Sequence, residues 1–116
     1  MNAPDALAVV ERFNDAWNRH DLDGVLTLVS EDCVFDSTGP APDGVRHQGK
    51  DALRSVWQPI FDDEASRFTV ESTFAAGDGH VVQLWRYDWD GGHVRGIDVF
   101  RVAGGKVTEK RSYVKG

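Results

Sequence analysis

Residues 80–102, HVVQLWRYDWDGGHVRGIDVFRV, decide the fold, because they hold two strand-like runs joined by a turn. Both runs are rich in Val, Ile and aromatic residues, which favour strands. The Asp-Gly-Gly between them is a hairpin signal. Further Gly-containing turns lie at 77–79 and 103–105, on either side of this hairpin. The pattern predicts an antiparallel meander of four strands, at 67–76, 80–89, 93–102 and 106–114.

Two helices are expected near the start of the chain. Apolar side chains recur every three to four residues over 6–17, as on one face of a helix. Asn2 can cap this helix, and Pro4 suits its first turn. Asp21 can cap a second, short helix over 22–29.

A strand, a loop and a third helix follow in the expected order. Residues 33–36 indicate a brief strand, and the Gly- and Pro-rich residues 37–49 a loop. A third helix begins near Lys50, and Pro59 should kink or end it. Three helices followed by an antiparallel sheet predict an α+β architecture with the helices on one sheet face. No linker or internal repeat divides the chain, so we expect residues 1–116 to form a single domain.

Charge and cysteine content narrow the function classes. The net charge of −6 argues against a nucleic-acid partner or an anionic membrane, since both need a basic patch. The densest basic cluster, 106–111, is interrupted by Glu109 and indicates a solvated strand face. Cys33 is the one cysteine, so no intrachain disulfide can form and a reducing compartment is expected. Without a signal-peptide pattern or a membrane-spanning segment, we expect a cytoplasmic protein.

No motif for a metal or a cofactor is apparent. The four histidines, at positions 20, 47, 80 and 93, are too scattered for a ligand motif. The glycine pairs lie at hairpin turns rather than between a strand and a helix, where phosphate loops occur. We therefore expect neither a metal nor a cofactor.

Asp98 interrupts an apolar run in the third predicted strand. Its neighbours at alternate positions include Phe100 and Val102, so Asp98 should lie on the face that meets the helices. An ionised carboxylate buried without a partner costs several kcal/mol, so this group is either paired or protonated.

The hairpin register decides which of these states applies. If the Asp-Gly-Gly turn is a three-residue loop, Leu84 faces Asp98 and Arg86 lies diagonally on the same face, as a partner for an ionised carboxylate. If the loop has two residues, Trp85 faces Asp98 and Arg86 points away, which favours a protonated carboxyl. The residues alone leave both registers open.

Asp36 lies where a strand enters the Gly/Pro-rich loop, a common place for a catalytic group at a pocket mouth. The alternative is a turn-initiating Asp bonded to the amides of Thr38 or Gly39. Taken together, Asp36 at a rim and Asp98 in an apolar wall would drive two pKa values apart, one suited to a base and one to a hydrogen-bond donor.

The four tryptophans are many for this length. Trp17 and Trp57 lie on apolar helical faces, where core packing is the default. Trp85 and Trp89 share a strand face with Tyr87. That aromatic row either lines a pocket for a flat hydrophobic ligand or covers a dimer interface, and the unresolved register leaves both open.

Residues 1–39, GIDVFRV at 96–102 and GKVTEKRSYV at 105–114 resemble the nuclear transport factor two-like superfamily. The chain is most similar to its ketosteroid isomerase and SnoaL-like polyketide cyclase branch. HDLDGVLTLVSEDCVF at 20–35 is the most telling piece for the fold. The resemblance implies a cone-shaped α+β barrel, in which a curved, mostly antiparallel sheet wraps around three helices. It also implies a deep apolar pocket and a homodimer formed through the outer sheet face.

The resemblance also assigns residue roles. Asp36 falls where ketosteroid isomerases keep the Asp that shuttles a proton next to a carbonyl, and Asp98 where they keep a protonated Asp that donates to the enolate oxygen. The Tyr that completes their oxyanion hole is matched by Phe13, which has no hydroxyl, and losing such a donor costs on the order of a hundredfold or more in rate. Limonene epoxide hydrolases are a weaker match: residues 86–88 resemble their Arg-x-Asp element, but their second Asp is matched by Ser112.

These observations favour a small-molecule pocket protein. The catalytic hypothesis is a cofactor-free isomerase or cyclase, in which Asp36 abstracts a proton beside a carbonyl and Asp98 stabilises the oxyanion. The expected ligand is a small hydrophobic molecule. Its binding residues are expected to be Phe13, Trp17, Trp57, Trp85, Arg86 and Phe100. The alternative is a non-enzymatic module of the same fold that binds a hydrophobic ligand or serves dimerisation.

Overall fold

The described part of the chain folds into three helices and six strands. In the computed structural model, which describes residues 5–115, the helices are α1 (Ala6–Asn18), α2 (Leu22–Thr27) and α3 (Lys50–Asp62). The strands are β1 (Val29–Asp36), β2 (Arg46–Gln48), β3 (Arg67–Gly77), β4 (His80–Trp89), β5 (Gly92–Ala103) and β6 (Lys106–Val114). No helix in this part of the chain has both the length and the apolar character needed to cross a membrane.

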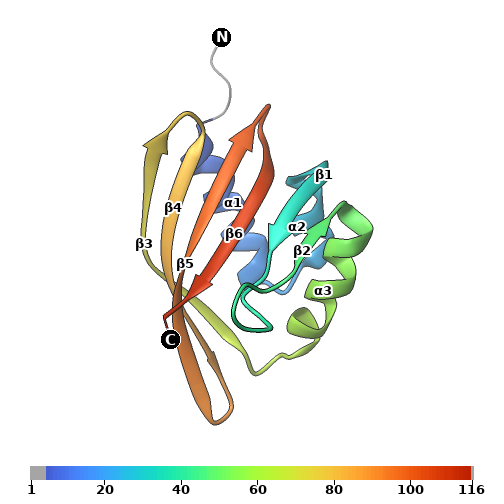
Figure 1. Cartoon of the computed structure of the whole chain (residues 1–116), viewed down its shortest axis with the longest axis vertical. Helices are drawn as coiled ribbons and strands as arrows, with labels where there is room; N and C mark the ends of the chain where they lie inside the picture. Colours follow the sequence, from blue (N-terminus) through green and yellow to red (C-terminus); the bar gives the residue numbers. More distant parts are fainter. Residues whose placement is uncertain (1–4, 116) are drawn as a thin grey trace.

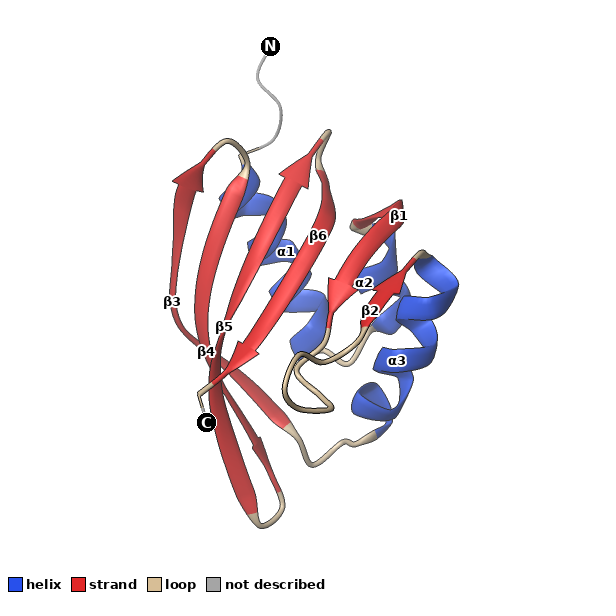
Figure 2. Ribbon diagram, viewed as in Figure 1, coloured by secondary structure: helices blue, strands red, loops and turns tan. Residues whose placement is uncertain are grey.

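The strands form one curved, unclosed sheet in the order β2-β1-β6-β5-β4-β3 (Figure 1). The predicted meander β3-β4-β5-β6 is confirmed, with antiparallel pairing throughout. Strand β1 joins β6 in parallel, and β2 pairs with β1 in antiparallel. The helices gather on one side of the sheet, with α1 behind the strands in the view of Figure 2. The α+β architecture expected from the sequence is therefore present.

The N-terminal helices begin at aspartate caps. Asp5 caps α1 by accepting a hydrogen bond from the Leu7 amide at 3.1 Å. Asp21 caps α2, as expected, by accepting from the Gly24 amide at 2.9 Å. The expected cap Asn2 and Pro4 lie outside the described residues.

Three boundaries differ from the sequence prediction. Strand β1 begins at Val29 rather than at residue 33, because Val29 pairs with Val107 of β6. A short strand, β2, forms inside the predicted loop, where Arg46 pairs with Asp36. Helix α3 continues past Pro59 to Asp62. Its last turn is held by packing, since the Phe61 ring lies 4.7 Å from that of Trp17.

The β4–β5 register differs from both alternatives considered above. Asp90 and Gly91 form a two-residue turn, with Gly91 at φ 97°, and Trp89 pairs with Gly92. As a result Gln83, rather than Leu84 or Trp85, lies opposite Asp98. Trp85 instead lies opposite Gly96, where an added Cβ would overlap the Trp85 ring. The prediction that either Leu84 or Trp85 lies opposite Asp98 was therefore wrong.

A bulge in β6 changes which of its side chains face inward. Val102 pairs with Val107, but Arg101 pairs with Glu109, so Thr108 is an extra residue in this strand. The bulge shifts the alternation, and Lys110 is buried at 7% exposure. The expectation that residues 106–111 form a solvated face is wrong for Lys110, because simple alternation does not anticipate the bulge.

The core fills the space between the helices and the inner sheet face. Phe13 is 1% exposed, and its ring centroid lies 5.4 Å from that of Phe100 and 6.1 Å from that of Trp57. A buried amide pair ties α1 to β4: Asn14 Nδ2 donates to Gln83 Oε1 at 2.5 Å, and Gln83 Nε2 donates to Asn14 Oδ1 at 3.2 Å. This reciprocal pair satisfies both buried amides.

Candidate functional site

A cavity of about 170 Å³ lies at the inner face of the sheet. Its walls are largely aromatic, with side chains from α1, α3 and strands β1, β3 and β4: Trp17, Phe35, Trp57, Phe68, Trp85 and Tyr87. Trp57 is fully buried, whereas Thr38 and Val114 are exposed, so the cavity runs inward from a mouth near the loop after β1.

Three polar side chains meet in the wall formed by β5 and β6: Asp98, Lys110 and Ser112. The Ser112 hydroxyl donates to Asp98 Oδ1 at 2.6 Å, and Lys110 Nζ donates to the Ser112 hydroxyl at 3.0 Å. Lys110 Nζ also lies 3.5 Å from Asp98 Oδ1. All three residues are buried, so they form a hydrogen-bonded ion pair inside the fold.

Aromatic rings surround the Lys110 ammonium. Its Nζ lies 4.8 Å from the Phe35 ring centroid, 5.4 Å from that of Trp17 and 5.9 Å from that of Phe100. Cation–π attraction at such distances stabilises a desolvated cation. The carboxylate, the hydroxyl and the rings together compensate for burying this charge.

Three buried polar atoms on the cavity walls have no hydrogen-bond partner within residues 5–115. They are Asp98 Oδ2, Trp57 Nε1 and Trp85 Nε1. Buried polar groups are almost always hydrogen-bonded, and one that is not costs about 1–3 kcal/mol. Within residues 5–115, three residues that line the cavity thus carry one acceptor and two donors that no other group satisfies.

The predicted site residues divide into two groups. Asp98, Trp17, Trp57 and Trp85 line the cavity, while Phe13 and Phe100 are buried in the core and do not line it. Arg86 is not at this site: it lies on the outer face opposite Arg95, and its Nη2 is 2.9 Å from Asp88 Oδ1. The observed register puts Arg86 on the face away from Asp98.

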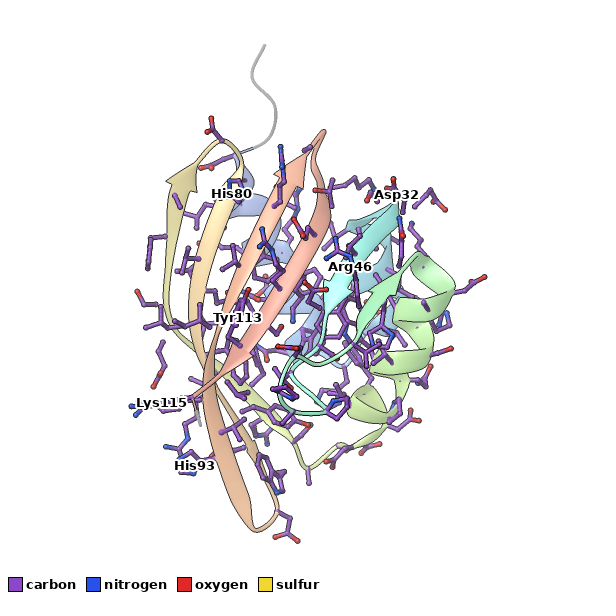
Figure 3. The ribbon with its side chains drawn as sticks, viewed as in Figure 1. Asp32, Arg46, His80, His93, Tyr113 and Lys115 are labelled. Carbon is purple, nitrogen blue, oxygen red and sulfur yellow. The ribbon has the colours of Figure 1, made fainter. Side chains whose placement is uncertain are left out.

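Asp36 also lies apart from the cavity. In β1 the buried Phe35 faces inward, so the next residue, Asp36, faces outward. Its Oδ1 lies 3.4 Å from Arg46 Nη1 on the neighbouring strand β2, and Figure 3 shows Arg46 beside β1. The loop after β1 is held by Ser37 rather than by the predicted Asp36 side chain: the Ser37 hydroxyl accepts a hydrogen bond from the Val45 amide at 3.0 Å. The geometry therefore does not bring Asp36 and Asp98 together as a rim base and a wall acid.

Sequence reasoning missed several residues of the cavity wall, among them Lys110, Ser112, Phe35 and Phe68. Lys110 and Ser112 are two positions apart and therefore share a strand face, which was a usable signal. Which face they share depends on the bulge at Thr108, and that bulge has no mark in the local sequence.

The Cys33 thiol does not line the cavity. Burial raises the pKa of the Cys33 thiol to about 12, so it stays protonated and is no nucleophile near neutral pH. Among residues 5–115, no three His, Cys, Asp or Glu side chains cluster closely enough to hold a metal ion.

Comparison with known proteins agrees with the geometry of the fold. The SnoaL-like domain family matches residues 10–110. A nuclear transport factor 2-like (NTF2-like) protein of unknown function from Mesorhizobium loti is 40% identical, with a TM-score of 0.87 over 98% of this chain and 93% of that one. No curated protein matches the chain.

Two more distant structures share the fold. A candidate polyketide cyclase from Xanthomonas campestris pv. campestris is 23% identical, with a TM-score of 0.76 over 99% of this chain and 93% of that one. A Mycobacterium tuberculosis protein, solved in complex with estradiol-17beta-hemisuccinate, is 26% identical, with a TM-score of 0.78 over 93% of this chain and 92% of that one.

Proposed function

Because the chain belongs to the SnoaL-like domain family and has its NTF2-like fold, we propose that it binds a small, largely apolar molecule in the cavity beside Asp98. The observation that carries this proposal is the aromatic cavity itself, whose lining residues include a buried ion pair and three buried polar atoms without a partner within residues 5–115. Apolar walls with a few placed polar groups are typical of small-molecule sites.

The size of the cavity indicates a molecule of one or two rings. A cavity of about 150 Å³ in another protein accommodates benzene. Here the cavity of about 170 Å³ adjoins a second one of about 130 Å³, and the two share Trp17, Ile60, Phe68 and Tyr87. The M. tuberculosis neighbour, solved with a steroid derivative, supports the use of this fold for flat ring systems.

Indole N–H resonances test the proposal by two-dimensional NMR. The probe 2-naphthol should shift the indole signals of Trp57 and Trp85, which line the cavity. Trp89 is the internal control, because it is 41% exposed on the same strand as Trp85 and does not line the cavity. Replacing each tryptophan by phenylalanine assigns the signals. Equal shifts at Trp89, or none at Trp57 and Trp85, would contradict binding in the cavity.

A second candidate is a cofactor-free isomerase or cyclase that removes a proton beside a carbonyl. What favours it is Asp98 on the cavity wall, because its Oδ2 has no hydrogen-bond partner within residues 5–115 and its Oδ1 lies 3.5 Å from Lys110 Nζ. In this proposal Asp98 takes the proton and Lys110 stabilises the developing oxyanion, roles that differ from those implied by the resemblance. Asp36, on the outer face, takes no part.

Hydrogen–deuterium exchange at the acidic C–H of 2-tetralone tests this reaction. We expect the exchange rate to fall about a hundredfold or more in Asp98→Asn and to stay unchanged in Asp36→Asn. Loss of exchange in Asp36→Asn alone would assign the base to the other face and reject this proposal.

We also propose that the outer sheet face pairs two copies of the chain. Large apolar side chains are exposed there, including Ile97 at 40% and Tyr113 at 55%. Figure 3 shows Tyr113 on the face away from the helices. Sedimentation of the wild type and of Ile97→Glu should give a dimer and a monomer, respectively; a monomeric wild type would contradict the pairing.

A further inference from the structure

We propose that the cavity selects a ring molecule with a hydroxyl group that donates a hydrogen bond to Asp98 Oδ2. This inference deepens the proposed binding function and rests on it, because it names the chemical class of the ligand. The resemblance implies the opposite polarity, with a protonated Asp98 that donates to a ligand oxygen.

The partners of Asp98 favour an acceptor. Its Oδ1 accepts from the Ser112 hydroxyl at 2.6 Å and lies 3.5 Å from Lys110 Nζ. A hydroxyl donor and an ammonium both stabilise a carboxylate rather than a neutral carboxyl. Because Lys110 is 7% exposed and Asp98 is fully buried, water screens this pairing little.

The second oxygen then needs a donor. Asp98 Oδ2 is buried and has no partner within residues 5–115, although its residue lines the cavity. A buried charged oxygen without a hydrogen bond is expensive, so a ligand that donates to it gains that energy. A ketone or an ether has no hydrogen to give and leaves the oxygen unpaired.

The tryptophans add the complementary requirement. The indole N–H groups of Trp57 and Trp85, which have no partner in the described part of the chain, can only donate. A hydroxyl group carries both a donor hydrogen and an acceptor oxygen, so an alcohol can pair with the carboxylate and with an indole N–H, whereas a ketone can pair only with an indole N–H. An alcohol on a flat, bicyclic ring matches the walls and the volume of about 170 Å³.

Calorimetric titration with three compounds of one shape tests the inference: 2-tetralol, 2-tetralone and 2-methoxytetralin. The wild-type protein should bind 2-tetralol at least about tenfold more tightly than the ketone or the ether, since a site built to pair a hydroxyl rejects analogues without it. A ketone that binds as tightly as the alcohol, or more tightly, overturns the inference while the binding function stands. No binding by any of the three overturns both.

A charge-neutral double variant sharpens the test. In Asp98→Asn/Lys110→Met the amide both donates and accepts, so the alcohol and the ketone should bind within about twofold of each other. A tenfold preference that persists in this variant overturns the role of Asp98. If the variant does not fold, the wild-type comparison of alcohol, ketone and ether still decides the inference.

Discussion

Asp98 and Asp36 each pair with a cation on a neighbouring strand, but on opposite faces of the sheet. Asp98 Oδ1 lies 3.5 Å from Lys110 Nζ, with the side chains 1% and 9% exposed. Asp36 Oδ1 lies 3.4 Å from Arg46 Nη1, with the side chains 28% and 62% exposed. The distances are nearly equal, so the two pairs differ mainly in how much water surrounds them.

That difference changes what each pair does. Exposed ion pairs contribute about 0–1 kcal/mol, because water and salt screen them. Arg46 also has a second partner, since its Nη2 lies 3.8 Å from Glu109 Oε2. A buried pair, in contrast, costs several kcal/mol to desolvate, and each partner then depends on the other. The buried pair in the cavity wall therefore belongs to the site that we propose for ligand binding, whereas the outer pair lies on an ordinary solvated surface.

The largest expected effect is that of Lys110→Ala, which leaves the Asp98 carboxylate buried without its cation. The free energy of unfolding in urea should fall by about 3–5 kcal/mol. Arg46→Ala is the matched control on the outer face and should cost less than about 1 kcal/mol. The double variant Asp98→Leu/Lys110→Met should be far less destabilised than Lys110→Ala. If Lys110→Ala and Arg46→Ala lowered the free energy of unfolding equally, the buried pair and the exposed pair would not differ in strength, which would contradict the prediction.

Ser112→Ala should have an intermediate effect. It removes the hydroxyl that links Lys110 to Asp98, and the loss of a buried, charge-assisted hydrogen bond costs about 1.5–3 kcal/mol. Ser30→Ala is the control, because the Ser30 hydroxyl donates to Asp32 at 3.1 Å on the exposed surface. Urea denaturation should show a change within about 0.5 kcal/mol for this control. Similar losses in both variants would mean that burial does not set the strength of these bonds.

The smallest effect concerns Arg86→Ala on the outer face. The hydrogen bond from Arg86 holds the pKa of Asp88 below its ordinary value, so this variant should raise that pKa in an NMR titration of the carboxyl. Because the folded pKa is lowered, the pair stabilises the fold above the unfolded pKa of Asp88 and loses this contribution as the pH falls through the folded pKa.

Arg95→Ala is the control for this titration, since Arg95 bonds Glu71 and lowers the pKa of that residue instead. It should raise the pKa of Glu71 and leave that of Asp88 nearly in place. High salt should weaken both shifts. A pKa of Asp88 that stays low in Arg86→Ala would show that another group holds it.

Local sequence determined the main elements and part of the site. Turn glycines and β-rich runs predicted the meander, and three-to-four spacing predicted the helices. The same alternation correctly placed Asp98 on the inner face, because a strand's side chains alternate whatever its partner is. The resemblance carried by residues 1–39, 96–102 and 105–114 predicted the family, which the match over residues 10–110 confirms.

Only the tertiary structure decided which side chains meet Asp98. The two-residue turn at Asp90 and Gly91 set Gln83 against it, and the bulge at Thr108 turned Lys110 toward it. Both depend on how segments distant in the chain pair: Val107 meets Val102 on one side and Val29 on the other. Alternation within a strand is a local property, but register and bulges follow from the best pairing and packing between strands, which no single segment encodes.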